Sequence, residues 1–186
     1  VVASMRAVLS RKGPMATDLS HRSLRRLLAL SLVGVFCGSV DLRAERALPF
    51  SLPTVEGTQF VLEKELGRGP LVLDFWATWC KPCIKALPGL QAIGKEYGPR
   101  GVRVFTINID GPRNESKIRL FMRRYRLELP VLLDKTNALM KQFHFIAPPA
   151  TVVLAPNGEV VYRQEGYRQG DDGKLRRALD ALLPPE

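Results

Sequence analysis

Short apolar runs and helix-spaced apolar positions alternate along this chain from residue 71 onward. Residues 71–76 read Leu-Val-Leu-Asp-Phe-Trp, a run that is typical of a central strand buried on both faces. The apolar stripe that follows has helical spacing up to Gly98-Pro99, and Pro88 inside it predicts a kink. We therefore expect a buried strand that leads almost directly into a long helix.

The same patterns predict the rest of the fold. The expected strands are residues 102–109, 130–133, 151–154 and 160–166, and the expected helices are residues 114–126, 137–143 and 172–183. Asn157-Gly158 between the last two strands is the strongest hairpin signal in the chain, and residues 47–66 suggest an added N-terminal hairpin. Because strands and helices alternate up to the hairpin, the sequence predicts an α/β fold with parallel neighbours in its sheet.

The N-terminal part has a different pattern. Arg22, Arg25 and Arg26 precede the apolar stretch 27–40, which is the arrangement of an export signal. This stretch of 14 residues falls short of the roughly 18 expected of a membrane span, which favours a cleaved peptide over an uncleaved N-terminal membrane anchor. We therefore expect residues 45–186 to be an extracytoplasmic domain, in a bacterial periplasm or anchored facing it.

The net charge of the chain does not alter the predicted fold or location. The net charge is +10, but residues 1–44 hold 7 of the 28 Lys and Arg and 2 of the 18 Asp and Glu, which leaves +5 for residues 45–186. The densest basic patch lies on the expected helix 114–126 and is interpreted as a solvated face, with an acidic partner protein as the alternative. No basic stripe with interleaved aromatics is present, so we expect no nucleic-acid partner.

The cysteines narrow the chemistry. Cys80 and Cys83 are the only thiols outside the export segment, and a zinc site is excluded because His144 is the only histidine there. We therefore expect no metal and no cofactor other than a redox-active disulfide. A structural disulfide across only two intervening residues would remove little entropy from the unfolded chain, so stabilisation of the fold is a weak explanation for this pair. At a helix start, however, the first thiol lies near unpaired N–H groups that stabilise a thiolate, and the second lies one turn in, within reach of a mixed disulfide.

This order of elements resembles the thioredoxin superfamily and, more narrowly, its extracytoplasmic TlpA- and ResA-like thiol-disulfide oxidoreductases. The matching residues are F75-W-A-T-W-C-K-P-C83, Pro88, N114-E-S-K-I118, L129-P-V-L-L-D134 and the stretch from Pro149 through Asn157-Gly158 to V160-V-Y162. The resemblance implies a thioredoxin fold: a central mixed β-sheet flanked by helices, with an N-terminal β-hairpin extension and a central insertion around residues 111–117.

The resemblance also implies roles for individual residues. Cys80 would be the exposed attacking thiol, Cys83 the buried resolving thiol, and Pro149 a cis-proline that faces the disulfide. Trp76 is expected to have a packing role. The residues expected to contact substrate are Trp79, Lys81, Pro82, Pro148 and Pro149.

Two departures from the family pattern are informative. Many TlpA- and ResA-like proteins have a glutamate three residues after the second cysteine, where this chain has Ala86. Asp74 occupies the strand position where thioredoxin keeps a buried acid, so we hypothesise that Asp74 transfers the proton to and from Cys83. The second departure is Pro148-Pro149 followed by Ala150, where the family commonly has a non-proline residue, the cis-proline and a threonine. Pro148 has no N–H to offer to a bound peptide.

The sequence thus predicts an exported thiol-disulfide oxidoreductase that reduces disulfides in exported partner proteins, such as the haem-binding cysteines of apocytochrome c or copper-site cysteines. A membrane thiol-disulfide electron donor would return it to the dithiol form. A disulfide-forming oxidant is one alternative, and a binding or chaperone module with a vestigial CxxC is another. A peroxiredoxin is disfavoured because the residues before Cys80 lack the proline of a PxxxTxxC context.

Overall fold

The strand expected at residues 71–76 is β3 (Leu71–Trp76), and it lies at the centre of a five-stranded sheet with the order β5-β4-β3-β6-β7. The structure is a computed structural model, and it describes residues 45–184. The other strands are β4 (Arg103–Asn108), β5 (Val131–Leu133), β6 (Ala150–Leu154) and β7 (Val160–Glu165). β3, β4 and β5 are parallel, whereas β6 is antiparallel to both β3 and β7, so the predicted mixed sheet is confirmed.

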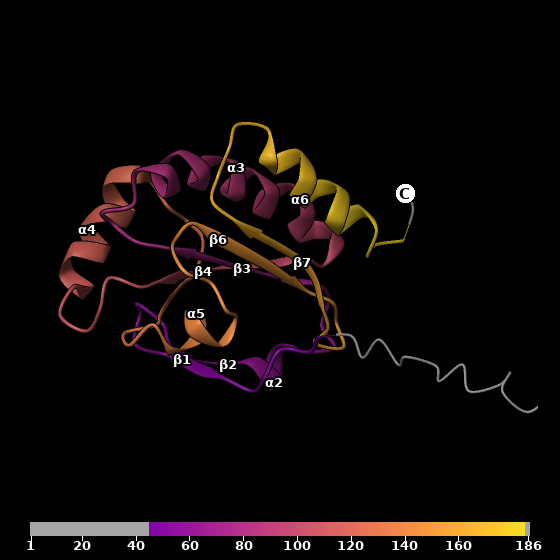
Figure 1. Cartoon of the computed structure of the whole chain (residues 1–186), viewed down its shortest axis with the longest axis horizontal. Helices are drawn as coiled ribbons and strands as arrows, with labels where there is room; N and C mark the ends of the chain where they lie inside the picture. Colours follow the sequence, from indigo (N-terminus) through magenta and orange to yellow (C-terminus); the bar gives the residue numbers. More distant parts are fainter. Residues whose placement is uncertain (1–44, 185–186) are drawn as a thin grey trace, which may run out of the picture. The chain divides into compact units, whose positions relative to one another are not determined.

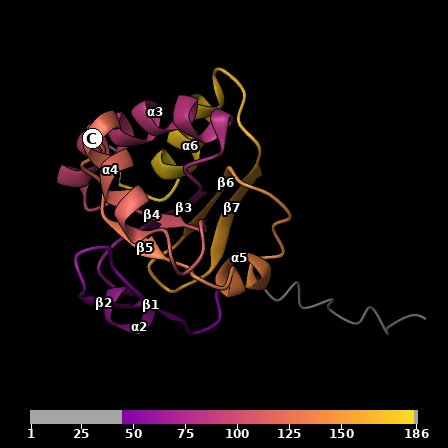
Figure 2. The same ribbon diagram turned by 90° about the vertical axis from the view of Figure 1, so that its left-hand side faces the viewer.

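The two faces of the sheet are covered by different elements (Figures 1 and 2). On one face lie the helices α3 (Lys81–Tyr97) and α6 (Asp171–Asp180), and the end of α4 (Glu115–Tyr125) packs beside α3. On the other face lie the expected N-terminal hairpin, β1 (Ser51–Pro53) with β2 (Gln59–Val61), and the short helices α2 (Leu62–Glu65) and α5 (Ala138–Gln142). The arrangement is the predicted thioredoxin-like fold.

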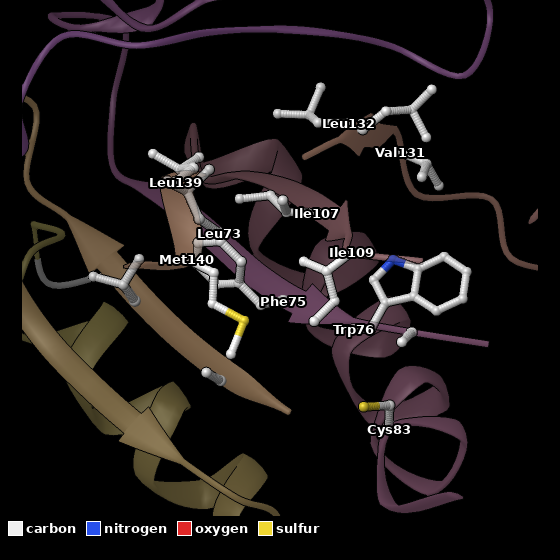
Figure 3. Close-up of a cluster of buried hydrophobic side chains, with 14 of the residues drawn as sticks. Leu73, Phe75, Trp76, Cys83, Ile107, Ile109, Val131, Leu132, Leu139 and Met140 are labelled. Carbon is white, nitrogen blue, oxygen red and sulfur yellow. The ribbon is translucent and has the colours of Figure 1, made fainter. Parts of the chain in front are cut away.

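Every residue of β3 is buried, because its alternating side chains enter two separate cores. Leu73 and Phe75 belong to the core beneath the hairpin and α5, whereas Val72 packs with the apolar residues of α3 and α6. Figure 3 shows the first of these cores, with Trp76 at the end of β3 beside Cys83 of α3. The strand that carries the chemistry is thus held on both sides.

Most predicted boundaries agree with the structure to within two residues. Pro88 lies inside α3, which continues through it to Tyr97, and Gly101, with a φ of 89°, ends the short turn that follows. The expected closing helix is shorter than predicted and ends at Asp180. The insertion expected around residues 111–117 contains a loop and the first residues of α4, which leads to the edge strand β5.

The expected export segment, residues 1–44, lies outside the described residues. Between residues 45 and 184, no helix has the length and apolar character needed to cross a membrane.

Candidate active site

The two cysteines lie where the C-terminal end of β3 passes into α3. Cys80 is the N-cap residue of this 17-residue helix, and Cys83 lies in its first turn. The loop before Cys80 is fixed by Asp110, which follows β4: its carboxylate accepts hydrogen bonds from Thr78 N at 2.8 Å and from Thr78 Oγ1 at 2.9 Å. Two parallel strands therefore position the start of the helix.

Cys80 and Cys83 form a disulfide. Cys80 is 3% exposed and Cys83 is 1% exposed, so the expectation of an exposed Cys80 is wrong for this form of the protein. Both residues belong to the apolar core that contains Trp76 and Leu87, because the disulfide closes at the point where the first turn of α3 meets the end of β3. The difference in burial between the two cysteines is therefore small in the oxidised protein.

The backbone of α3 favours negative charge at Cys80. The N–H of Cys83 donates a hydrogen bond to Cys80 Sγ over 3.2 Å, and this bond caps the helix. A thiolate at the N-cap also faces the positive end of the helix dipole. Pro82 lies in the first turn, where its missing N–H leaves no helical bond unmade. After reduction, Cys80 is thus the better stabilised thiolate of the pair.

Asp74 lies in β3, on the face covered by α3 and α6. It is 4% exposed, and burial raises the pKa of its carboxyl group from 3.8 to about 7, although a hydrogen bond from Thr151 opposes the shift. This bond runs from Thr151 Oγ1 to Asp74 Oδ1 over 2.7 Å. Because its pKa lies near neutrality, Asp74 can accept and release a proton under the conditions in which thiols exchange.

A small cavity opens beside the Asp74 carboxyl group. Its volume is about 30 Å³, which is room for one or two water molecules. Ala86 of α3, at the position of the missing family glutamate, lines the same cavity. Among the described residues only Thr151 makes a side-chain hydrogen bond to Asp74, so the second carboxylate oxygen is left for water. The small Ala86 side chain thus leaves space next to the acid that remains.

Sequence reasoning missed most of the polar lining of this cavity. The lining includes Tyr162 and Gln164 of β7 together with Tyr167, Asp171 and Asp172 from the segment that leads into α6. Tyr162 and Gln164 are two residues apart, so they share one face of β7, and polar residues on the covered face of a strand are a signal in the sequence. Asp171 and Asp172 gave no such signal, because acids are common in the first turn of a helix.

Three of the predicted substrate-contact residues adjoin the disulfide in the chain: Trp79, Lys81 and Pro82. Trp79 is 61% exposed, and Lys81 and Pro82 are exposed at the start of α3. Pro148 is half-buried, Pro149 is buried, and the bond between them is cis, as the resemblance implies. Their contacts with substrate stay predictions.

Three further residues differ in the exposure of their side chains. Trp76 is fully buried, with its ring 4.8 Å from that of Phe121, which supports the expected packing role. Ile146, three residues before Pro149, is 90% exposed and was not singled out from the sequence. His144 is exposed beyond the end of α5. In the described part of the chain, no group of three or more His, Cys, Asp or Glu forms a set of metal ligands.

Comparisons with known proteins agree with this geometry. The model of the AhpC/TSA family matches residues 44–163 of this chain. The thiol-disulfide oxidoreductase ResA of Bacillus thuringiensis is 30% identical over 135 residues, covering 73% of this chain and 75% of that protein. The ResA of Halalkalibacterium halodurans is 28% identical over 180 residues, covering 91% of this chain and 99% of that protein.

A solved structure is also similar. The exposed lipoprotein thioredoxin Etrx1 of Streptococcus pneumoniae is 26% identical with a TM-score of 0.61, covering 73% of this chain and all of that one. The fold and the disulfide at the start of α3 define a thiol-disulfide oxidoreductase of the thioredoxin superfamily. The chain belongs to the AhpC/TSA family, and within the superfamily it is a ResA-like protein.

Proposed function

We propose that this protein is an extracytoplasmic reductant of disulfides in exported partner proteins. The observation that carries the proposal is the pairing of a helix-capping Cys80–Cys83 disulfide with the buried Asp74, whose pKa is about 7. A vestigial CxxC in a binding module does not need a titrating carboxyl group buried in the strand that leads to it, and acids are rarely buried unless they are paired.

The exchange proceeds in two steps. The Cys80 thiolate attacks one sulfur of the substrate disulfide, forms a mixed disulfide, and releases the other substrate sulfur as a thiolate. Cys83 then loses its proton to Asp74 and attacks Cys80 Sγ, which releases the second substrate sulfur. The substrate gains two electrons and, as two thiols, two protons. One proton comes from Cys83 through Asp74 and the other from solvent, because Cys80 begins as a thiolate. The protein is left with the Cys80–Cys83 disulfide.

The extracytoplasmic location and the reducing direction rest on the resemblance to TlpA- and ResA-like proteins and on the apolar stretch at residues 27–40. The similar protein of Streptococcus pneumoniae is an exposed lipoprotein, which supports the same location for this chain. The substrates proposed are the haem-binding cysteines of apocytochrome c or copper-site cysteines. Because an extracytoplasmic compartment is oxidising, a membrane thiol-disulfide donor must return the protein to its dithiol form.

Alkylation of the reduced protein carrying Cys37→Ser, in which Cys80 and Cys83 are the only cysteines, tests this proposal against a binding module. We expect one cysteine, Cys80, to react fast at pH 7 with a pKa below the ordinary value near 8.5, because the helix start stabilises its thiolate. Mass spectrometry of the alkylated peptides identifies the residue. Two slow cysteines with ordinary pKa values would contradict the proposed exchange chemistry and favour a binding module.

A further inference from the structure

A surface groove lies directly beside the disulfide. Its volume is about 480 Å³. One wall is the start of α3, and the other is the loop that connects β7 to α6. The lining residues are Lys81, Pro82, Lys85, Tyr167 and Gln169.

The charges in this groove are all positive. Lys81 and Lys85 are four residues apart on α3, so their side chains project from the same face, about 6 Å apart along the helix axis. Both are exposed, and neither has an ion-pair or hydrogen-bond partner between residues 45 and 184. No carboxylate lines the groove.

The two acids that act on Tyr167, a residue of the groove, do not pair with the groove lysines. Asp171 accepts hydrogen bonds from Lys174 Nζ and from the backbone N–H of Arg168, each over 2.7 Å. The carboxylate of Asp172 lies against the backbone of Gly89, so closely that a methyl group at Gly89 would collide with it. Neither acid forms an ion pair with the two lysines, so the positive charge of the groove is available to a partner.

Tyr167 adds an uncharged, flat surface to the groove. Burial, together with the nearby Asp172 and Asp171, raises the pKa of Tyr167 above its usual value of 10.0, so its hydroxyl stays protonated at neutral pH. Tyr167 also lines the cavity that holds the Asp74 carboxyl group. A peptide segment bound in the groove would therefore contact Tyr167, and Tyr167 in turn lies between the groove and the cavity of Asp74.

The position of the groove selects its occupant. Lys81 directly follows Cys80, so a substrate chain whose sulfur bonds to Cys80 brings its neighbouring residues to this wall. An extended chain advances about 3.3 Å per residue, so a few residues are enough to pass both lysines. We propose that the groove binds an acidic stretch of the substrate protein, with Asp or Glu side chains within a few residues of the reacting cysteine.

This inference rests on the proposed function, and it adds the chemistry of the substrate. A binding experiment on the oxidised full-length protein tests it without requiring turnover. Two cysteine-free peptides of equal length, one rich in glutamate and one rich in lysine, are titrated while the backbone amide signals of Lys85 and Gln169 are followed by NMR. We expect the acidic peptide alone to shift these signals at low salt, and the shifts to weaken as salt rises.

The variant Lys85→Glu replaces an attraction with a repulsion, and we expect it to weaken binding of the acidic peptide about tenfold. Lys117→Glu is the matched control, because Lys117 is an exposed lysine on α4 without an ion-pair partner among the described residues. It should leave the affinity unchanged. Equal binding of the two peptides, or an unchanged affinity in Lys85→Glu, would overturn the inference.

Reduction of an uncharged disulfide peptide by the reduced protein separates this inference from the proposed function. If the uncharged peptide is reduced but the acidic peptide does not bind, only the groove assignment is wrong. If the acidic peptide binds in a Lys85-dependent way but no disulfide is reduced, the groove assignment stands and the proposed exchange chemistry fails.

Discussion

Thr151 and Asp74 face each other across the antiparallel pair of β3 and β6, and Thr151 Oγ1 donates a 2.7 Å hydrogen bond to Asp74 Oδ1. In TlpA- and ResA-like proteins a threonine commonly follows the cis-proline directly, whereas here Ala150 comes first and Thr151 next. Alternate residues of a strand face opposite sides of the sheet, so this shift places the hydroxyl on the face of Asp74. The buried acid therefore keeps one fixed partner while its pKa stays high.

Replacement of Asp74 with asparagine should slow resolution of the mixed disulfide, because Cys83 loses the group that accepts its proton. We expect a decrease of about 10²-fold near pH 7, the lower end of the usual contribution of a general base. Stopped-flow measurement of substrate release over a range of pH tests this.

The first step of the same reaction is the internal control. Attack by Cys80 does not use Asp74, so its rate should be unchanged in Asp74→Asn. A resolution rate with the same value and the same pH dependence as the wild type would rule out Asp74 as the base.

Asp74 should also make the stability of the fold depend on pH. Its pKa is about 7 in the folded protein and about 3.8 in the unfolded chain, so the folded protein binds the proton more tightly. The contribution of Asp74 to the free energy of unfolding is therefore complete below about pH 4. It is lost as the pH rises through about 7, which lowers the free energy of unfolding by up to roughly 4 kcal/mol.

Denaturant unfolding of the oxidised protein at pH 5 and pH 8 measures this effect. Asp74→Asn should remove most of the difference between the two values, because the asparagine does not titrate. The same loss of stability between pH 5 and pH 8 in both proteins would show that the pKa of Asp74 is not raised.

Ala86→Glu restores the acid that the family commonly carries after the second cysteine. In this chain the new carboxyl group would enter the cavity that already holds Asp74. Two carboxylates in one small cavity cannot both ionise easily, so we expect the pair to titrate in two steps, one of them above pH 7. NMR titration of the carboxyl carbons checks this, with Lys85→Glu, a new carboxylate on the exposed face of α3, as the control. A single titration near pH 4 for the introduced glutamate, with Asp74 unaffected, would contradict the shared cavity.

Pro148→Thr should tighten the binding of a trapped substrate peptide. The threonine supplies a backbone N–H that proline lacks, and one added hydrogen bond contributes on the order of 1 kcal/mol, or about fivefold in affinity. Pro99→Thr, at an exposed proline remote from the disulfide, is the control. Equal dissociation constants for Pro148→Thr and the wild type would show that the substrate does not use this backbone position.

Much of the fold follows from local patterns. Five of the six residues of β3 are apolar, which predicts a strand buried on both faces, and the sequence of β3 and α3 places Cys80 and Cys83 at a helix start without any tertiary information. The Asn157-Gly158 turn similarly predicts the hairpin of β6 and β7. Such features depend on neighbours in the chain, which a sequence shows directly.

The cavity and the groove could not be predicted in this way. Both depend on where α6 and the loop before it pack against α3, which places Tyr167 and Asp171 more than 80 residues from Cys80 in the chain but beside its helix. The burial of Cys80 was also missed, because it depends on the closed disulfide and the core around it rather than on the CxxC spacing.

The reduction potential of the Cys80–Cys83 couple decides whether this protein reduces its partners or oxidises them. The full-length protein carrying Cys37→Ser, which leaves only this couple, is equilibrated with defined thiol-disulfide buffers, and the fraction of disulfide is measured. A potential near that of thioredoxin, about −270 mV, is the result that a dedicated reductant predicts. A potential near about −120 mV, as in a strong oxidant, would contradict the proposed reducing direction.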